Sequence, residues 1–286
     1  MDGIIIINKQ KNFTSNDIVQ IVKKMFNKKV GHTGTLDPMA TGVLPLLIGK
    51  GTLCSKYLIN HDKIYDVNLK LGIRTDTGDL EGNIVEEKNV SKDIFEEENV
   101  KKILNSFLGN QEQIPPMYSA IKVNGKKLYE YARKGEKVDI QPRKITIYEI
   151  SLLKIEKEKN TISFRVKCSK GTYIRSLCED IAKRLGTIGF MEDLNRIQVG
   201  EFNIKQAVTI DELEKNDLIK TKIITIEEIF KDLEKIEMTE KDLTMFLNGV
   251  KMTTNKANGI YKIYNNEIFI GTGIVENKRL KRDIIV

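Results

Sequence analysis

The residue types around one carboxylate, that of Asp37, are compatible with a catalytic role. Asp37 lies in a polar loop, and Pro38 follows it directly. Proline disfavours helical dihedrals in the residue before it, and glycines allow a backbone or a ligand to approach closely. The loop leads into the apolar segment 43–48, a predicted buried strand or helix, and side chains on loops with such rigid neighbours are often reactive; a structural turn is the alternative. The glycines of this loop are Gly31, Gly34 and Gly42.

The charge of the chain indicates an acidic partner. Its 286 residues carry a formal net charge of +7, which suits nucleic acid. Residues 121–144 hold eight basic and three acidic side chains, whereas residues 76–99 hold nine acidic and two basic ones. This asymmetry predicts a one-faced electrostatic footprint for a nucleic acid. Two ordinary solvated faces are the alternative.

Several other classes of protein fit the sequence poorly. No apolar run approaches the roughly 18–20 residues of a membrane span, and the start of the chain, MDGIIIINKQK, is unlike a secretory signal. We therefore expect a cytoplasmic protein without a membrane partner. The three cysteines are far apart, and the carboxylates that follow Asp76 lack the spacing of a calcium loop, so no metal site is expected. Leu44 stands where a phosphate-binding loop needs a glycine, so the sequence also lacks this nucleotide site.

Interleaved strands and helices must position the loop of Asp37. The predicted strands, read from apolar runs and from alternation, are 3–8, 65–71 and 162–168. The predicted helices are one capped by Ser15, one at 100–108 and one between Gly171 and Gly186. Because these elements do not form regular βαβ units, we expect a mixed α+β fold rather than a doubly wound sheet.

The end of the chain has a different character. Residues 203 to about 237 are charged and predicted to be helical. A short helix at 241–247 and a hairpin at 260–270, which turns at Asn265-Asn266, follow them. This pattern indicates a small β-rich module.

The segment GHTGTLDPMATGVLPL, residues 31–46, resembles the signature of the TruB family of pseudouridine synthases. Five further segments resemble the same family, so the likeness covers most of residues 3–202. They are GIIIINKQKNFTSNDIV, DKIYDVNLKLGIRTDTGDLEG, QIPPMYSAIKVNGKKLYEYARKG, CSKGTYIRSL and LNRIQVGEF. The resemblance implies an α+β, mixed-sheet pseudouridine synthase catalytic domain at 1–235 and a small C-terminal PUA-like RNA-binding module at 236–286.

The resemblance also implies roles for individual residues. Asp37 would be the catalytic carboxylate, Arg175 its cationic partner and Tyr65 an aromatic platform for the base, although alternation alone would make Tyr65 a core residue. The family pattern is broken at Gln10 and Asn12, where a proline and a glycine are usual. The expected substrate-binding residues are Lys9, His32, Tyr173 and Leu194. The expected RNA phosphate contacts are Lys122, Lys126, Lys127 and Arg133.

The implied reaction is the isomerisation of uridine to pseudouridine at position 55 in the T loop of tRNA. It breaks the bond from ribose C1′ to uracil N1, turns the flipped-out base and rejoins it through C5. We therefore expect neither a cofactor nor a metal. The expected partner is tRNA, bound by a monomer that needs no other protein. An RNA-binding or tRNA-folding protein with a vestigial synthase fold is one alternative, and a guide-dependent pseudouridylase is another.

Overall fold

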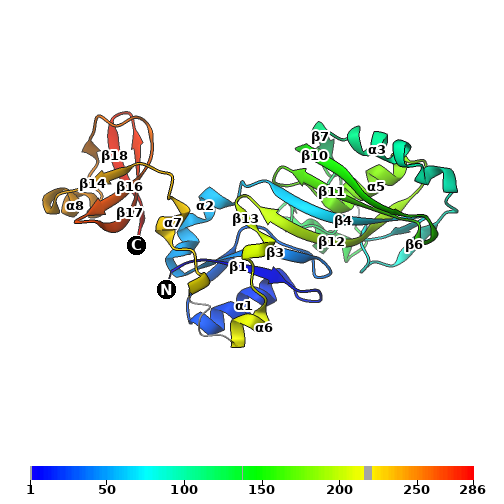
Figure 1. Ribbon diagram of the computed structural model, residues 1–286, viewed down its shortest axis with the longest axis horizontal. Helices are drawn as coiled ribbons and strands as arrows, with labels where there is room; N and C mark the ends of the chain where they lie inside the picture. Colours follow the sequence, from blue (N-terminus) through cyan, green and yellow to red (C-terminus); the bar gives the residue numbers. More distant parts are fainter. Residues whose placement is uncertain (1, 137, 216–220) are drawn as a thin grey trace.

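A computed structural model describes residues 2–136, 138–215 and 221–286 of the chain. The longer strands form two sheets, one of nine strands and one of five. The smaller sheet lies at one end of an elongated molecule (Figure 1). Helices and strands are interleaved along the chain, which confirms the predicted α+β class.

The larger sheet is mixed. Its strands are β1 (Gly3–Lys9), β2 (Val30–His32), β3 (Thr41–Ile48), β4 (Lys63–Leu71), β7 (Gly109–Gln113), β10 (Arg143–Glu156), β11 (Thr161–Cys168), β12 (Gly189–Val199) and β13 (Phe202–Asn203). The strand order is β1-β3-β12-β4-β11-β10-β7, with β2 beside β3 and β13 beside β12. The strands β3 and β12 run parallel, and the other neighbours are antiparallel.

Three predicted strands are confirmed as β1, β4 and β11. Along β4, buried and half-buried residues alternate without a break, as the sequence pattern requires. The apolar segment 43–48 is a strand rather than a helix, because it forms most of β3 and pairs with β1 along its length. Buried on both faces, it lacks the alternation that would distinguish a strand in the sequence.

Helices pack around this sheet, and some of them lie where the sequence predicts helices. The α-helices are α1 (Ser15–Phe26), α2 (Ser55–Leu58), α3 (Glu97–Asn105), α4 (Leu128–Ala132), α5 (Ile174–Arg184), α6 (Ile210–Lys215), α7 (Ile226–Ile229) and α8 (Glu240–Leu247). The 3-10 helices are η1 (Gly49–Cys54), η2 (Lys92–Phe95), η3 (Lys157–Lys159) and η4 (Ile204–Gln206). In the described parts of the chain, no helix has the length and apolar character needed to cross a membrane.

The predicted cap of the first helix is wrong by one residue. Thr14 caps α1, because its side chain accepts a hydrogen bond from the backbone N–H of Asp17, whose carboxylate accepts one from the backbone N–H of Thr14. Ser15 is buried instead and exchanges two hydrogen bonds with the backbone of Leu36, at 2.8 and 3.1 Å. Ser15 therefore ties the start of α1 to the loop of Asp37.

The region between the two sheets is less helical than predicted. Among the described residues of 203–237, the α-helical segments are the short α6 and α7, and residues 216–220 of the prediction lie outside the described chain. Thr225 begins α7 with a capping box to Glu228. A high content of Lys and Glu favours helix at each position, but it does not lengthen a helix that lacks a continuous apolar face.

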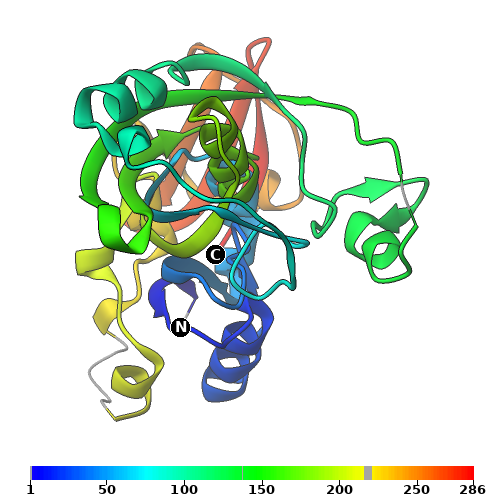
Figure 2. The ribbon, with the colours of Figure 1, turned by 90° about the vertical axis from the view of Figure 1, so that its right-hand side faces the viewer.

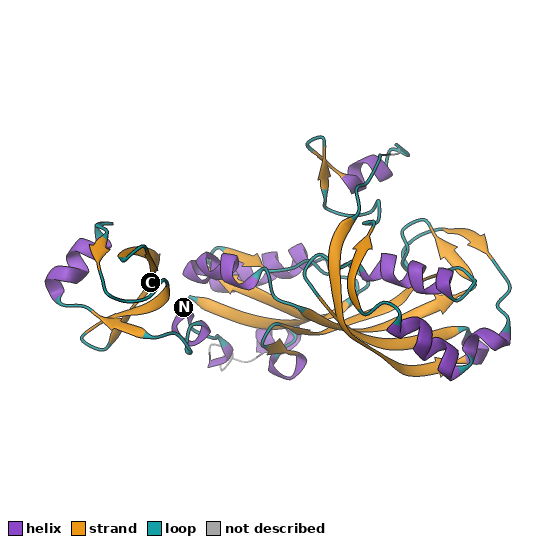
Figure 3. Cartoon of the chain, turned by 90° about the horizontal axis from the view of Figure 1, so that it is seen from above, coloured by secondary structure: helices purple, strands orange, loops and turns teal. Residues whose placement is uncertain are grey.

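Two hairpins stand apart from the large sheet. One joins β5 (Ile73–Thr75) to β6 (Ile84–Glu87), and the other joins β8 (Lys122–Val123) to β9 (Lys126–Lys127). The second hairpin and α4 form an arm, residues 119–136, that projects from the body (Figures 2 and 3).

The smaller sheet forms the predicted C-terminal β-rich module. Its strands are β14 (Lys235–Glu237), β15 (Met252–Thr253), β16 (Gly259–Asn265), β17 (Ile268–Glu276) and β18 (Arg279–Ile285), in the order β14-β16-β17-β18-β15. The hairpin turns at Asn266 and Glu267, one residue later than predicted, and both have positive φ. The module is PUA-like and buries a hydrophobic cluster of its own, which includes Phe246 and Ile263. We propose 1–235 and 236–286 as the two domains, with a boundary that falls within β14.

A buried carboxylate joins the module to helix α2 of the body. The side chain of Asp283, on β18, is 3% exposed and pairs with Lys56 and the hydroxyl of Tyr57, both on α2. Thr272 of β17 donates to the same carboxylate at 2.9 Å. Next to it, Ile284 packs into a hydrophobic cluster with residues of β1 and β3. Hydrogen bonds and apolar contacts therefore both hold the last strand against the body.

We expect Asp283→Ala to lower the free energy of unfolding by about 1–3 kcal/mol, because it leaves the half-buried hydroxyl of Tyr57 and the hydroxyl of the buried Thr272 without their acceptor. Urea denaturation measures this change. The matched control is Asp232→Ala, because Asp232 is exposed. Equal stability of the two variants would contradict a role for Asp283 at the junction.

Candidate active site

The structure brings Asp37 and Arg175 together, although they lie 138 residues apart in the sequence. Asp37 occupies the loop between β2 and β3, and Arg175 lies in the first turn of α5. The Nε of Arg175 is 3.2 Å from Oδ2 of Asp37, and its Nη2 is 3.5 Å from Oδ1. The guanidinium is 8% exposed, whereas the Asp37 side chain is 31% exposed. A cation held by the protein thus faces a carboxylate that remains partly open.

Arg175 also binds a second carboxylate, which the sequence analysis did not assign. Its Nη1 is 3.3 Å from Oδ2 of Asp79, and this carboxylate is 4% exposed. The hydroxyl of Thr77 donates to Oδ1 of Asp79 at 2.6 Å, and the backbone N–H of Glu81 donates to the same oxygen at 3.1 Å. Asp79 is one of the acidic residues of segment 76–99. Its position within one acidic segment does not indicate a partner on a distant helix.

The remaining donors of Arg175 bind backbone carbonyls. Nη1 donates to the carbonyl of Thr77 at 3.2 Å, and Nη2 donates to that of Tyr118 at 2.9 Å. Four groups from three segments therefore fix one guanidinium. Because Tyr118 directly precedes the arm, the base of the arm is tied to the carboxylates as well.

The environment of Asp37 disfavours its charged form. Burial raises the pKa of the Asp37 carboxyl above its ordinary value, the positive charge of Arg175 opposes this rise, and the negative charge of Asp79 adds to it. Arg175 favours the ionised carboxylate, as expected, but burial is the larger effect. Asp37 is thus a stronger base than an exposed aspartate.

The guanidinium of Arg196 binds the backbone of the loop that carries Asp37. Arg196 lies on β12 and is 1% exposed, and it donates to the carbonyl of Val43 at 2.8 Å and to that of Gly34 at 2.9 Å. These carbonyls lie on opposite sides of Asp37 in the sequence. Gly42, at φ 105°, has no room for a side chain, because a Cβ there would lie 2.2 Å from the carbonyl oxygen of Arg196. Arg196 matches the family pattern in LNRIQVGEF, but its type and position in the sequence do not indicate this role.

Lys9, expected to bind substrate, is fully buried at the end of β1. Its ammonium donates to the carbonyls of Gln10, Phe13 and Pro38, at 2.9, 2.7 and 3.0 Å. These bonds use all three donors of the ammonium and tie β1 to the residue that follows Asp37. Burial lowers the pKa of Lys9 to about 8. A direct contact with substrate remains a prediction.

Tyr65 lies on β4 and is 7% exposed. It belongs to the same hydrophobic cluster as Leu194 and as Leu36 and Met39, which lie close to Asp37 in its loop. Burial raises the pKa of the Tyr65 hydroxyl to about 12, although the nearby charge of Arg196 opposes this rise. The hydroxyl is therefore protonated at neutral pH. Leu194, on β12, is equally buried, as an apolar wall requires.

His32 and Tyr173 shortly precede Asp37 and Arg175, respectively, in the chain. His32 ends β2, and its buried Nδ1 has no hydrogen-bond partner among the described residues. Burial lowers the pKa of His32, so the ring is neutral at neutral pH. Tyr173 directly precedes α5, and its backbone exchanges hydrogen bonds of 2.8 and 3.0 Å with the side chain of Gln113. Arg175 thus lies in the first turn of a helix whose start is fixed by Gln113 of β7.

The residues expected to contact phosphates all lie on the arm, away from this buried cluster. Lys122, Lys126 and Arg133 are exposed, and Lys127 is half-buried. Lys127 and Arg133 both lie 5.3 Å from the ring of Tyr129, which limits the positions of their charges. The arm therefore presents ordered cations on a projection whose base contacts Arg175.

The arrangement can support chemistry at a single carboxylate. One partly open aspartate lies beside a fixed cation, a buried tyrosine and an apolar wall. Among the described residues, no group of three or more His, Cys, Asp or Glu side chains could hold a metal ion. Such a site can use the carboxylate as a nucleophile or as a base.

Comparison with known proteins agrees with the resemblance. Residues 23–174 match the TruB family pseudouridylate synthase N-terminal domain, and residues 175–236 match the tRNA pseudouridylate synthase B C-terminal domain. A relative from Clostridium perfringens, called tRNA pseudouridine synthase B, is 45% identical over 98% of this chain and 97% of its own length. A relative of the same name from Caldanaerobacter subterraneus is 42% identical over 98% of each chain.

Solved structures share the fold. A Cbf5-Nop10-Gar1 complex contains a chain that aligns with a TM-score of 0.68 at 24% identity, covering 95% of this chain and 78% of that one. An H/ACA RNP bound to a substrate RNA containing 2′-deoxyuridine aligns with a TM-score of 0.69 at 21% identity, covering 99% and 85%. The family match, the identity to relatives and the shared fold agree, and this chain belongs to the TruB family of pseudouridine synthases.

Proposed function

We propose that this enzyme converts uridine 55 in the T loop of tRNA to pseudouridine and that Asp37 is its essential carboxylate. The observation that carries the proposal is the geometry of Asp37, a partly open carboxylate held at 3.2 Å from the buried guanidinium of Arg175. The relatives named tRNA pseudouridine synthase B, which align over nearly the whole chain, support tRNA as the substrate.

The reaction rearranges bonds without a net change of oxidation state. The bond from ribose C1′ to uracil N1 breaks, a new bond joins C1′ to C5, and the proton leaves C5 while N1 gains one. Asp37 can attack C1′, attack C6, or remove a proton from C2′. Each of these routes needs the deprotonated carboxylate. Arg175 keeps Asp37 in place and favours its charged form.

The target uridine must leave the stack of the T loop before it reaches Asp37, at a cost of a few kcal/mol. An aromatic side chain against the base can recover roughly 1–3 kcal/mol. Tyr65 is our candidate for this contact, with Tyr173 beside it and Leu194 as the apolar wall. His32, neutral at the end of β2, can occupy the space that the flipped base leaves.

The exposed charges of the arm complement this buried site. Lys122, Lys126, Lys127 and Arg133 would contact phosphates of the T arm and set affinity rather than base specificity. We further propose that the enzyme acts as a monomer in the cytoplasm and needs neither a guide RNA nor a protein partner. If purified protein turns over tRNA only with a guide RNA, this part of the proposal is wrong.

We expect Asp37→Asn to fold and bind tRNA but to lose at least about 10³-fold in single-turnover rate, because an amide is neither a base nor a comparable nucleophile. Tritium release from C5-labelled uridine in an unmodified tRNA transcript measures the rate. The matched control is Asp17→Asn in the cap of α1. An Asp37→Asn rate near that of the wild type would refute the assignment, and tight binding without turnover by the wild type would favour an RNA-binding protein.

The pH dependence of the rate gives a second test. Because burial raises the pKa of Asp37, the single-turnover rate should fall on acidification at a pH above the ordinary aspartate value of about 4. Asp79→Asn removes a negative charge that raises this pKa, so the fall should move to lower pH. Arg175→Gln removes the opposing positive charge and should move it to higher pH. Shifts in the same direction for both variants would contradict the proposed electrostatics.

Removal of two arm charges tests the RNA contact. We expect Lys122→Gln/Lys126→Gln to weaken binding of both tRNA and an isolated T-arm hairpin, and to reduce the slope of log K against log salt by roughly 1.4–1.8. Filter binding at several salt concentrations measures both quantities. Lys154→Gln/Lys157→Gln, which removes two exposed lysines beyond the arm, is the control. An unchanged slope would place the RNA elsewhere.

A further inference from the structure

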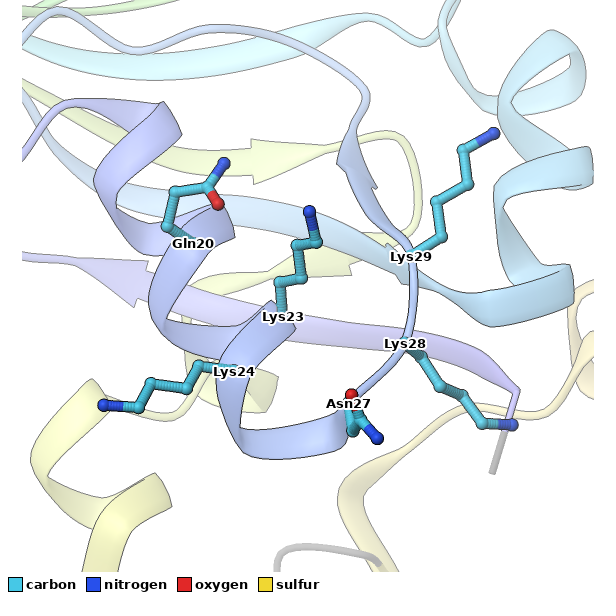
Figure 4. Close-up of a pocket in the computed structure, with 6 residues that line it drawn as sticks. All are labelled: Gln20, Lys23, Lys24, Asn27, Lys28 and Lys29. Atoms are coloured by element: carbon cyan, nitrogen blue, oxygen red, sulfur yellow. The ribbon is translucent and has the colours of Figure 1, made fainter.

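A second group of lysines lies outside the site and the arm. It surrounds a surface cavity of about 480 Å³ where α1 ends and the chain turns towards β2 (Figure 4). The lining residues are Gln20, Lys23, Lys24, Asn27, Lys28 and Lys29. Neither the carboxylate chemistry nor the arm accounts for this concentration of positive charge.

Most of this charge is free to meet an external anion. Lys28 pairs with Asp2 at 2.9 Å. Lys23, Lys24 and Lys29 are exposed, and no carboxylate lies within 4.0 Å of their ammonium groups in the described parts of the chain. In Figure 4, the side chains of Lys23 and Lys29 extend towards the same side, and the amide of Gln20 does so too. Lys24 and Lys28 point away in other directions.

A favourable interaction with the helix dipole accounts for only some of these lysines. Lys23 and Lys24 lie in the last turn of α1, where a cation interacts favourably with the carbonyl end of the helix. Lys29 lies beyond the left-handed C-cap Asn27 and cannot act in this way. Its backbone carbonyl accepts a hydrogen bond from Gly49 at 2.7 Å, which fixes the segment that carries it. Lys23 and Lys29, whose side chains extend towards the same side, therefore come from different segments, the helix α1 and the turn after it.

The register of β3 gives the separation along the strand between the backbone next to Lys29 and the end of the Asp37 loop. Val30, next to Lys29, pairs with Ile48 at the end of β3, whereas the loop of Asp37 enters the strand at Thr41. The seven residue steps between Thr41 and Ile48 span roughly 23 Å at about 3.3 Å per residue. This length spans several base-pair steps of a nucleic-acid helix. An RNA phosphate at the lysines would therefore belong to nucleotides well away from the flipped uridine.

We propose that Lys23 and Lys29, assisted by the amide of Gln20, bind backbone phosphates of the tRNA outside the T arm. This inference rests on the proposed function, because it assumes that a T-loop uridine occupies the Asp37 site. The contact carries no base specificity and adds affinity only for an RNA long enough to reach both places. It makes the enzyme prefer an intact tRNA to a T-arm hairpin.

The double variant Lys23→Gln/Lys29→Gln tests the proposal with two RNAs, an unmodified full-length tRNA transcript and its T-arm hairpin. We expect the variant to bind tRNA roughly 5–20-fold more weakly, with a salt slope reduced by roughly 1.4–1.8. Hairpin binding should not change, and single-turnover rates at saturating RNA should match the wild type on both substrates. Filter binding and tritium release measure these quantities.

A matched control removes the same charge from other helix ends. Lys102 and Lys183 lie exposed in the last turns of α3 and α5, so Lys102→Gln/Lys183→Gln removes the same amount of charge, each time from a helix end as in Lys23→Gln, without altering the α1 group. Equal effects of the two double variants on tRNA, or equal weakening of tRNA and hairpin, would overturn the inference. Wild-type turnover of the hairpin would leave the proposed function standing in that case. No turnover of either RNA by the wild type would instead overturn the proposed function.

Discussion

One guanidinium is the constraint on which the site depends. Arg175 binds Asp37 and Asp79 and donates to the carbonyls of Thr77 and Tyr118, so it joins three segments that the chain places far apart. Two nearby carboxylates in a partly buried site repel each other, and a cation between them offsets that repulsion. The same contacts hold Asp37 in one position. Arg175 therefore acts on both the position and the charge of the carboxylate.

Buried polar groups around the loop complete this arrangement. Lys9, Ser15 and Arg196 each bind backbone atoms of the segment around Asp37 rather than other charged side chains. Burial of a charge is costly, and hydrogen bonds to carbonyls offset the cost only when the geometry is well satisfied. A loop held in this way changes little in shape, as a reaction sensitive to displacements of about 1 Å requires.

The charges of the protein divide into two classes by burial. Arg175 and Arg196 are nearly inaccessible and act on the carboxylate and its loop. The lysines of the arm and of the α1 group are mostly exposed and strongly hydrated, and their attraction to phosphates weakens with salt. We therefore propose that the buried cations serve the chemistry and that the exposed ones serve RNA affinity. The junction at Asp283 ties the C-terminal module to the same body.

Local patterns in the sequence determined the elements and the reactive loop. Alternation placed β4 and β11, and the order of residue types around Asp37 identified the family. Only the tertiary structure brought Asp79 to Arg175 and Arg196 beneath the loop, because these contacts join residues from separate strands and helices and leave no periodic trace. It also moved the first cap from Ser15 to Thr14, since burial against Leu36 used the serine hydroxyl. Short-range patterns specify elements, whereas long-range packing decides which polar groups meet.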